Sequence, residues 1–582
     1  MIGAGPRGTS VVERLLANAG RNARLDIHVI DPYPPGGGKV WRAGQPEVLL
    51  MNTLGGHATA FLDDSVRCAG PIAPGPTLFE WAKTVVPQGN YPPRIADAAR
   101  ELQPWTFPAR ALHGHYLAWV FDHLAATAPS GVRLHTHRAR ATELRTGASG
   151  RVVRTDRGDE LAADVVILAT GHTRTEPTDA ERELRRFARR HGRWYAPPAN
   201  PLDLDLDGIA PGETVLARGL GLNFFDCLAL LTEGRGGRFE RAGGLLRYRP
   251  SGREPVVYAG SRTGVPYRAR PHHRDHLPPA RLARHFTAAV VAALRARPEP
   301  VDFATEVWPL IEQDARAAHG DAPVDFARLT DPLAGRRLST RDELAEVMVD
   351  LLRTDLAAAL DPEHSLVKAA TTALGAARGR IRELVAGGRL RGASHRDDLD
   401  GWFRGMAASL ASGPPAIRQE QLLALVDAGL VGFVGPRMSI GTDEETGEFL
   451  GTSPAVGGQP VRATALLEAR LPRADLRRTA DPLLRSLRDG GQCRPYVLPD
   501  PDGPGYETGG MEVTEELRVV DKTGRPHRDL FAFGIPTESV HWGTAIGART
   551  GANAILFRQS DAIARAVLGH VNGLAGTPGS RR

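Results

Sequence analysis

Three glycines at the start of the chain restrict its fold more than any other feature. Gly3, Gly5 and Gly8 form the pattern G-x-G-x-x-G and lead into a segment with apolar residues at helical spacing. The β-rich run RLDIHVID follows and ends at Asp31, at the spacing of about 20 residues that such a pattern requires. A glycine-rich turn, a helix and a strand ending in an acid indicate a dinucleotide-binding unit, in which Asp31 accepts hydrogen bonds from ribose hydroxyls.

Each residue of this glycine turn has its own expected role. Gly3 permits the turn from strand to helix, Gly5 lets the backbone approach a pyrophosphate, and Gly8 lets the helix pack against the strand. Pro6 and Arg7 begin the helix, whose N-terminus offers N–H groups and the positive end of its dipole to phosphate. We therefore expect all five residues to bind a dinucleotide cofactor.

The segment before the glycines is short. Only Met1 and Ile2 precede Gly3, whereas a parallel strand usually contributes about five residues. We therefore expect the natural start of the protein to lie several codons upstream.

Composition excludes several classes of protein. Apolar runs fall short of the roughly 20 residues that span a bilayer, and residues 1–20 do not form a signal peptide, so we expect no membrane association. The formal net charge is +6, but acidic residues are interspersed and aromatic residues make up only 6%, which disfavours nucleic-acid binding. The densest basic stretch, residues 181–193, is interpreted as a solvated helix face. Three distant cysteines exclude a disulfide framework and a multi-cysteine zinc site, and they favour a cytoplasmic protein.

The residues after Asp31 resemble a known family. A Gly-Gly-x-x-Trp patch ends at Trp41, and Leu-Met-Asn-Thr, which contains Asn52, and Phe-Leu-Asp-Asp come next. With the glycine turn, these motifs resemble the flavin-containing and N-hydroxylating monooxygenases, and the whole chain is most similar to a group of bacterial FAD/NAD(P)-binding proteins related to them. The resemblance implies that Trp41 and Asn52 bind cofactor and that Asn52 lies beside the flavin and the nicotinamide. The alternative is that they pack a turn and cap a loop.

The next segments fit the same resemblance. Residues 107–125 have the pattern of an amphipathic helix that covers the flavin domain. A β-meander and a buried strand follow, and the strand ends at Ala-Thr170-Gly171. In the family, this is where the chain passes the cofactor and crosses between its dinucleotide domains, so Thr170 and Gly171 are expected at the cofactor.

A second strand-turn-helix pattern predicts another nucleotide site. Gly219 and Gly221 match the first two glycines, but Phe224 takes the third position, so the helix cannot approach its strand as closely. An α/β turn without a ligand is the alternative. Ser261 and Arg262 follow a later β-rich run, where two-dinucleotide flavoproteins often hold a 2′-phosphate. Arginine suits phosphate, so NADPH is expected over NADH, with Arg268 and Arg270 nearby.

The middle of the chain differs from the rest in composition and periodicity. Residues 277–428 show Ala-, Leu- and Arg-rich helical periodicity, and we expect them to be inserted in the second nucleotide domain, where they build the substrate cavity. The histidines of residues 271–279 suggest a metal site, but flanking prolines disfavour the helix that would align them, so we expect a solvated loop and no metal. Ser365-Leu-Val-Lys368 is interpreted as helix surface.

The C-terminal segment is expected to return to the first domain. A strand should end at Gly534, and a helix from Gly543 to Ala566 should point its N-terminus at the flavin. The family usually has Gly-Asp here, whereas Ile535 follows Gly534, and Glu538 is the candidate for the missing contact with the ribityl chain. The neighbouring His and Trp at 541 and 542 either line the flavin ring or pack the turn.

These patterns predict an α/β fold with two Rossmann-like dinucleotide-binding domains of the three-layer flavoprotein type, both discontinuous, with a helical insertion. The expected order along the chain is two cofactor domains, the insertion, and then the second part of each cofactor domain. The boundaries are 1–180 and 481–572 for the FAD-binding domain, 181–276 and 429–480 for the NAD(P)H-binding domain, 277–428 for the insertion and 573–582 for a disordered tail.

The predicted function follows from the resemblance. It is an FAD-dependent, NADPH-using monooxygenase that acts through a flavin 4a-hydroperoxide on a small nucleophilic substrate, with molecular oxygen as the second substrate. Two alternatives stay open: a flavin-dependent NAD(P)H reductase or dehydrogenase without oxygen transfer, and a non-catalytic dinucleotide-binding redox sensor. The substrate and the oligomeric state are not specified by the sequence.

Overall fold

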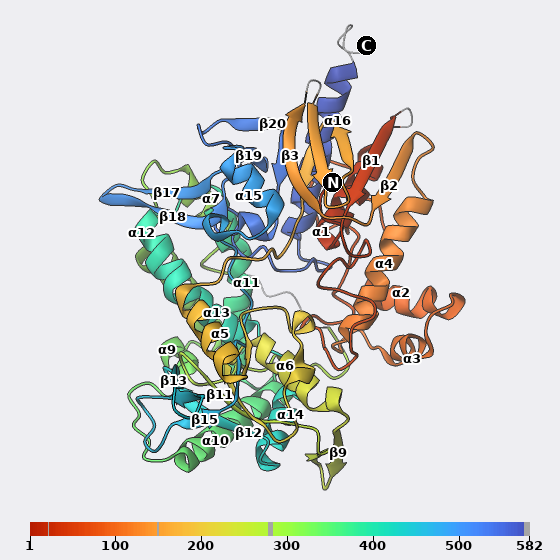
Figure 1. Cartoon of the computed structure of the whole chain (residues 1–582). Coiled ribbons are helices and arrows are strands. Elements are labelled where there is room, and N and C mark those ends of the chain that lie inside the picture. The colour runs from red at the N-terminus through yellow and green to blue at the C-terminus, as the bar shows by residue number, and fades with distance from the viewer. Residues whose placement is uncertain (21–22, 148–149, 278–282, 576–582) are drawn as a thin grey trace.

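The computed structural model describes residues 1–20, 23–147, 150–277 and 283–575. Two mainly parallel sheets lie at opposite ends of the molecule, and helices from the middle of the chain lie between and beside them (Figure 1). The sheet at the top of Figure 1 combines N-terminal and C-terminal segments, and the sheet at the bottom is built from the middle of the chain. The predicted pair of Rossmann-like units is confirmed.

The first sheet contains the segment that precedes the glycine turn. Ile2 makes parallel bridges to Ile30 on one side and to Leu168 on the other, so it takes the central position of the sheet. The α-helices on its faces begin with α1, which directly follows the glycines, and end with α16 at the other terminus, and the two pack together. The elements are β1 (Leu25–Ile30), β2 (Val132–His137), β6 (Val166–Leu168), β20 (Pro526–Ala532), β19 (Arg518–Val520), α1 (Pro6–Asn18) and α16 (Ile555–Ala575).

Smaller elements surround this sheet. A three-stranded antiparallel meander packs against α15. A group of helices around the buried Trp81 covers the other side of the sheet. The helix expected over residues 107–125 is present from Arg110. These elements are α2 (Leu78–Thr84), α3 (Pro93–Glu101), α4 (Arg110–Ala126), β3 (Ala141–Gly147), β4 (Gly150–Thr155), β5 (Glu160–Ala163), α15 (Pro482–Asp489), β17 (Pro495–Asp500) and β18 (Gly503–Met511).

The second sheet has five parallel strands in the order β12-β11-β8-β16-β7. Phe224, at the third position of the second glycine pattern, is buried in the core between this sheet and its helices. The elements are α5 (Asp179–His191), β7 (Trp194–Ala196), β8 (Thr214–Arg218), α6 (Leu222–Leu231), β9 (Arg238–Ala242), β10 (Leu245–Arg249), β11 (Val256–Ser261), β12 (Val431–Pro436), β13 (Ser439–Asp443), β14 (Glu448–Thr452), β15 (Val461–Ala463) and β16 (Ala465–Leu467).

The helices of the middle segment belong to two different cores. α10 and α14 pack on the second sheet, whereas α7, α8, α11 and α13 enclose a separate apolar core that also holds Trp542. The middle segment therefore partly completes the nucleotide domain and partly forms its own layer. Its helices are α7 (Ala288–Ala296), α8 (Trp308–Ala318), α9 (Phe326–Thr330), α10 (Arg341–Leu360), α11 (Leu366–Ala386), α12 (Gly392–Ser394), α13 (Arg404–Ala411) and α14 (Ala416–Asp427).

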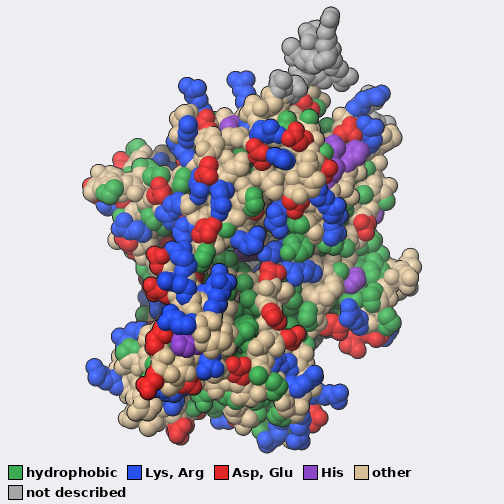
Figure 2. Space-filling model, viewed as in Figure 1, with side chains coloured by type: hydrophobic (Ala, Val, Ile, Leu, Met, Phe, Trp, Pro, Cys, Tyr) green, Lys and Arg blue, Asp and Glu red, His purple; other side chains and the backbone are tan. Residues whose placement is uncertain are grey.

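Charge is distributed over the surface in the way that the composition indicates. Figure 2 shows Lys and Arg side chains across the whole visible face with Asp and Glu side chains between them. Most of the basic stretch 181–193 lies in α5, which buries only Leu184, Phe187 and Ala188, so its interpretation as a solvated helix face is confirmed. Among the described residues, no helix combines the length and the apolar character that crossing a bilayer requires.

The predicted start of the C-terminal helix is wrong. The helix expected from Gly543 begins only at Ile555, because residues 543–554 form a loop in which Gly543 and Gly551 adopt positive φ angles of 73° and 66°. The helix then continues to Ala575, into the segment expected to be a disordered tail. The remainder of that expected tail, residues 576–582, lies outside the described part of the chain.

Candidate active site

One cavity of about 1670 Å³ occupies the space between the first sheet, α11 and the 543–554 loop. Pockets for a single small ligand usually measure about 300–1,000 Å³, so this cavity has room for more than one. It brings together much of the predicted cofactor site and the catalytic candidate. The predicted residues that line it are Gly3, Gly5, Pro6, Arg7, Asp31, Trp41, Asn52, Thr170 and Gly171.

The glycine turn has the geometry that a dinucleotide needs. Gly3 has φ +100°, and a Cβ on Gly8 would lie 2.0 Å from the carbonyl oxygen of Gly3. A Cβ on Gly5, in contrast, would meet nothing closer than the Gly37 oxygen at 3.9 Å, because Gly5 faces the cavity. Gly3 and Gly8 therefore allow the close packing of strand and helix, and Gly5 leaves open space for a phosphate.

The N-terminus of α1 is ready to receive an anion. Gly5 is its N-cap and makes no side-chain capping bond, and its first turn carries no acidic residue. The first N–H groups and the positive end of the helix dipole can therefore bind a pyrophosphate. Arg7 on the same turn is half-buried, donates a hydrogen bond to the Thr544 carbonyl oxygen and lies over the ring of Phe533, and desolvation lowers its pKa to about 10. These residues fit FAD.

Asp31 is held in place by the backbone. Its Oδ2 accepts a hydrogen bond from the Ala4 N–H at 2.7 Å and its Oδ1 accepts one from the Tyr33 N–H at 2.8 Å. Burial raises the pKa of this carboxyl, and the two backbone bonds oppose that rise. The carboxylate faces the cavity with further lone pairs available, which is the arrangement that a ribose hydroxyl requires.

We expect the change Asp31→Ala to weaken FAD binding about ten- to a hundredfold. A hydrogen bond to a charged group is worth roughly 1.5–3 kcal/mol, and about 1.4 kcal/mol corresponds to a factor of ten. The dissociation constant of FAD for the reconstituted apoprotein checks this. Asp26→Ala is the control, because Asp26 is an exposed residue of β1, the strand that Asp31 follows, and pairs with Arg133. Equal FAD affinity in the two variants would contradict the assignment.

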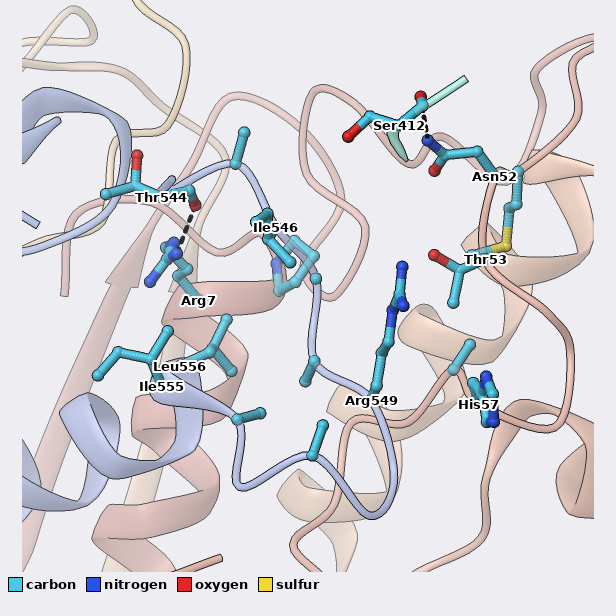
Figure 3. A pocket seen from close by; sticks show the side chains of 18 of the residues that line it. Arg7, Asn52, Thr53, His57, Ser412, Thr544, Ile546, Arg549, Ile555 and Leu556 are labelled. Atoms are coloured by element: carbon cyan, nitrogen blue, oxygen red, sulfur yellow. Dashed lines mark hydrogen bonds between the residues drawn. The ribbon is translucent and has the colours of Figure 1, made fainter. Parts of the chain in front are cut away.

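Asn52 connects the first domain to the helices of the middle segment. Its Nδ2 donates to the Ser412 carbonyl oxygen at 3.4 Å, and Ser412 directly follows α13 (Figure 3). Trp41 lies edge-on to His113 with ring centroids 4.7 Å apart and also faces the cavity. This hydrogen bond joins Asn52 to a segment far away in the sequence and does not cap the loop that contains Asn52. The Oγ1 of Thr170 is buried on the cavity wall without a partner in the described chain, as expected beside a polar ligand.

The second glycine pattern lies at a separate place. Gly219 has φ +129°, and Ser261 ends the strand β11 that pairs with β8, so Gly219 and Ser261 follow neighbouring parallel strands. A Cβ on Gly221 would lie 3.1 Å from the ring of Tyr267, so this glycine is covered where Gly5 is open. Leu222, the first residue of α6, lines the large cavity. The assignments of Gly219, Gly221, Ser261 and Arg262 stay predictions.

The C-terminal residues make contacts within the chain, and the cofactor roles of Gly534 and Gly543 stay predictions. A Cβ on Gly534 would lie 2.7 Å from the Arg7 side chain, so Gly534 makes room for that arginine. Glu538 accepts hydrogen bonds from the N–H groups of Gly543 at 2.9 Å and Thr544 at 2.8 Å, so its carboxylate stabilises the loop instead of being free for a ribityl chain. Trp542 packs in the helical core against Phe403, which favours the packing alternative for it.

The Ser-x-x-Lys segment is not helix surface, so that interpretation is wrong. Ser365 is the N-cap of α11, and Lys368 is buried. Its Nζ donates to Asp355 Oδ1 at 2.7 Å and to the Ala269 oxygen at 2.6 Å. The sequence pattern missed this because the partner carboxylate comes from another helix, α10.

Several cavity residues were missed by sequence reasoning. Arg378 and Arg382 lie on α11, Arg549 extends from the 543–554 loop into the pocket, and Arg270, considered only for the 2′-phosphate, also lines it (Figure 3). Cationic side chains outnumber carboxylates on the cavity wall. His57 is there too, and burial and Arg549 lower its pKa. The carboxylates on the wall are Asp31, Glu363, Glu383 and Asp481.

The histidine-rich loop also reaches this cavity. His273 and His276 line it, and His276 pairs with Asp275 at 2.7 Å. Within the described part of the chain, no group of three His, Cys, Asp or Glu side chains is arranged to hold a metal ion. The end of the loop, residues 278 and 279, lies outside that part.

Comparisons with known proteins agree with this geometry. A family model described as FAD-NAD(P)-binding matches residues 1–173. The chain is 41% identical to an L-aspartate N-monooxygenase (nitrosuccinate-forming) of Streptomyces davaonensis, over 98% of this chain and 97% of that protein. It is 40% identical to a nitrosuccinic acid synthase of the fungus Aspergillus oryzae, over 98% and 92%. The similarity therefore extends beyond the expected bacterial group.

A solved structure also covers the whole chain. The ornithine hydroxylase of Pseudomonas aeruginosa aligns over 98% of both chains, with a TM-score of 0.47 and 12% sequence identity.

Proposed function

The chain belongs to the family of the L-aspartate N-monooxygenases, and from this premise we propose that its substrate is L-aspartate, oxidised at the amino nitrogen. As a member of this family it is an FAD-dependent monooxygenase that uses NADPH. The first oxidation balances as amine, O₂, NADPH and a proton giving hydroxylamine, water and NADP⁺. When bound, FAD reduced by NADPH activates oxygen and supplies one oxygen atom to the nitrogen.

The positive charge of the cavity wall is the observation that carries this proposal. L-Aspartate has two carboxylates, and half-buried arginines of α11 and of the 543–554 loop line the same cavity as Asn52. A cavity with this charge attracts a substrate with two carboxylates and a net negative charge, and it disfavours a substrate with a net positive charge such as ornithine or lysine.

The residues of the chain divide the work between binding and positioning. The α1 N-terminus with Gly5 binds the FAD pyrophosphate, and Asp31 binds the ribose. Asn52 has no titrating proton, so it orients bound groups by donating and accepting hydrogen bonds.

Turnover with L-aspartate tests the function. The purified holoenzyme is expected to oxidise NADPH in the presence of L-aspartate and oxygen and to form N-hydroxyaspartate, detected by mass spectrometry. Product analysis also distinguishes one oxidation from continued oxidation to nitrosuccinate, the product named for three relatives. Matched assays with L-ornithine and L-lysine are the controls. Oxidation of these amines with no product from L-aspartate would refute the proposal.

We further propose that Arg262 holds the 2′-phosphate of NADPH, because it directly follows the end of β11 beside the turn after β8. The change Arg262→Ala should then raise the KM for NADPH about tenfold more than the KM for NADH, since one charge-assisted contact is lost. Steady-state kinetics with both cofactors measure this. An equal effect on both would make Arg262 a structural residue.

The three cysteines are unpaired, which supports activity in the reducing cytoplasm. Cell fractionation is expected to recover the activity with the cytoplasmic enzymes, and recovery from a secreted fraction would contradict this.

A further inference from the structure

Several half-buried arginines line the cavity without a carboxylate partner in the described chain, and three of them lie close enough to repel one another. Arg270, Arg378 and Arg549 line the same space. In the part of the chain that the structure describes, none of the three has a guanidinium nitrogen within 4.0 Å of an Asp or Glu carboxylate oxygen. Ion pairs are common elsewhere in the molecule. We call these three residues the arginine triad.

The triad lowers the stability of the folded protein in the absence of an anion. Burial and mutual repulsion lower the pKa of Arg270 well below its usual value, and burial with the charges of Arg549 and Arg382 lowers that of Arg378 to about 10. The Nε atoms of Arg270 and Arg378 are buried with no hydrogen-bond partner in the described structure. Buried charges without partners are retained where a ligand supplies the opposite charge.

The backbone around Arg270 is rigidly held. Asp355 accepts a hydrogen bond from the Ala269 N–H at 2.7 Å, and Lys368 donates one to the Ala269 oxygen at 2.6 Å. Asp355 and Lys368 also pair with each other at 2.7 Å, and both are buried. The buried ion pair of α10 and α11 therefore positions the residue next to Arg270.

The other two arginines come from different elements. Arg378 donates through Nη2 to the Ala407 oxygen at 3.1 Å and through Nη1 to the Oγ of Ser412, the residue whose carbonyl accepts from Asn52. Arg549 stands on the 543–554 loop and extends into the pocket between Ile546 and the segment with Thr53 (Figure 3). Its pKa is lowered by burial. The triad is thus next to Asn52.

We propose that the arginine triad is a dicarboxylate site that receives both carboxylates of the substrate beside Asn52. The identity of that substrate as L-aspartate rests on the proposed function, whereas the dicarboxylate chemistry rests on the triad. Guanidinium groups bind carboxylates through two parallel hydrogen bonds, so three of them can saturate two carboxylates. The sites proposed for the cofactor phosphates lie elsewhere, at the uncapped N-terminus of α1 with Arg7 for FAD and at Arg262 for the 2′-phosphate of NADPH.

Calorimetric titration of the holoenzyme with succinate tests the site without turnover. Arg378→Gln and Arg549→Gln should each weaken succinate binding about ten- to a hundredfold, and the KM for L-aspartate should rise to a similar extent. FAD content and the dissociation constant of NADP⁺ should stay as in the parent protein. Arg549→Lys keeps the charge and should restore part of the affinity. Arg353→Gln, which changes an exposed arginine of α10, is the matched control.

The possible results separate this inference from the proposed function. Unchanged succinate binding in both glutamine variants would overturn the dicarboxylate site, even if the parent enzyme oxidises L-aspartate. Weaker NADP⁺ binding with unchanged succinate binding would overturn it as well and assign the triad to a nucleotide phosphate. Succinate binding that depends on the triad, in an enzyme that does not oxidise L-aspartate, would support the site and refute the proposed function alone.

Discussion

The change Gly8→Ala is expected to yield a protein that purifies without FAD. The added Cβ would lie 2.0 Å from the Gly3 carbonyl oxygen and 3.0 Å from its carbon, which are backbone atoms and cannot move as a side chain does. α1 would have to shift away from the first sheet, and with it the N–H groups that bind pyrophosphate. Overpacking of this kind costs about 3 kcal/mol or more, which corresponds to at least about a hundredfold in FAD affinity.

The flavin absorbance of the purified variant and its FAD dissociation constant measure this effect. Gly569→Ala is the matched control, because it makes the same change on the exposed side of α16 where a Cβ meets nothing within 4 Å. There, alanine should raise stability slightly, since glycine inside a helix costs about 0.5–1 kcal/mol relative to alanine. A Gly8→Ala protein with a full complement of FAD would show that the turn is not the pyrophosphate site.

The change Asn52→Leu is expected to shift the reaction from oxygenated product to hydrogen peroxide. Leucine has a similar volume but lacks the amide that faces the cavity and donates to the Ser412 oxygen. Loss of one positioned polar group at a reacting centre commonly costs about 10²–10³ in rate, so the ratio of product to peroxide should fall by about ten- to a hundredfold.

Parallel assays of hydroxylated product, hydrogen peroxide and consumed NADPH give this ratio. FAD content and anaerobic reduction by NADPH should persist, which distinguishes the variant from one that is only misfolded. A purely structural role for Asn52 predicts a different pattern: a lower melting temperature with an unchanged ratio. That pattern would remove Asn52 from the catalytic residues.

Much of the first cofactor site could be predicted because its signals are local. Gly3, Gly5, Gly8 and Asp31 lie within one strand-turn-helix-strand unit, where spacing alone determines which atoms meet. Strand and helix positions around them follow from short-range periodicity. The errors occurred where the same local reasoning was extended to segments that tertiary contacts control. The helix expected at Gly543 is one such case. That segment is a loop on the cavity wall, and the Glu538 carboxylate stabilises it through hydrogen bonds.

Lys368 illustrates the same limit from the other direction. A lysine three residues after a serine is surface-like by pattern, yet it is buried because Asp355 of α10 compensates its charge. The helical layer as a whole shows periodicity that predicts helices but does not specify their partners. Two of its helices, α10 and α14, complete the second nucleotide domain, and the others form a separate core.

The sequence by itself therefore indicated the two dinucleotide-binding units through residues close together in the chain. Its resemblance to the flavin monooxygenases implied the flavin cofactor and Asn52 as the catalytic candidate. Only the tertiary structure decided what the cavity recognises. Arg270, Arg378 and Arg549 belong to a loop after β11, to α11 and to the loop before α16, and each is one arginine among many in the sequence. Folding places these three side chains together in a cavity wall, away from carboxylates. Because the local dielectric constant there is low, their positive charges are best compensated by a bound anion.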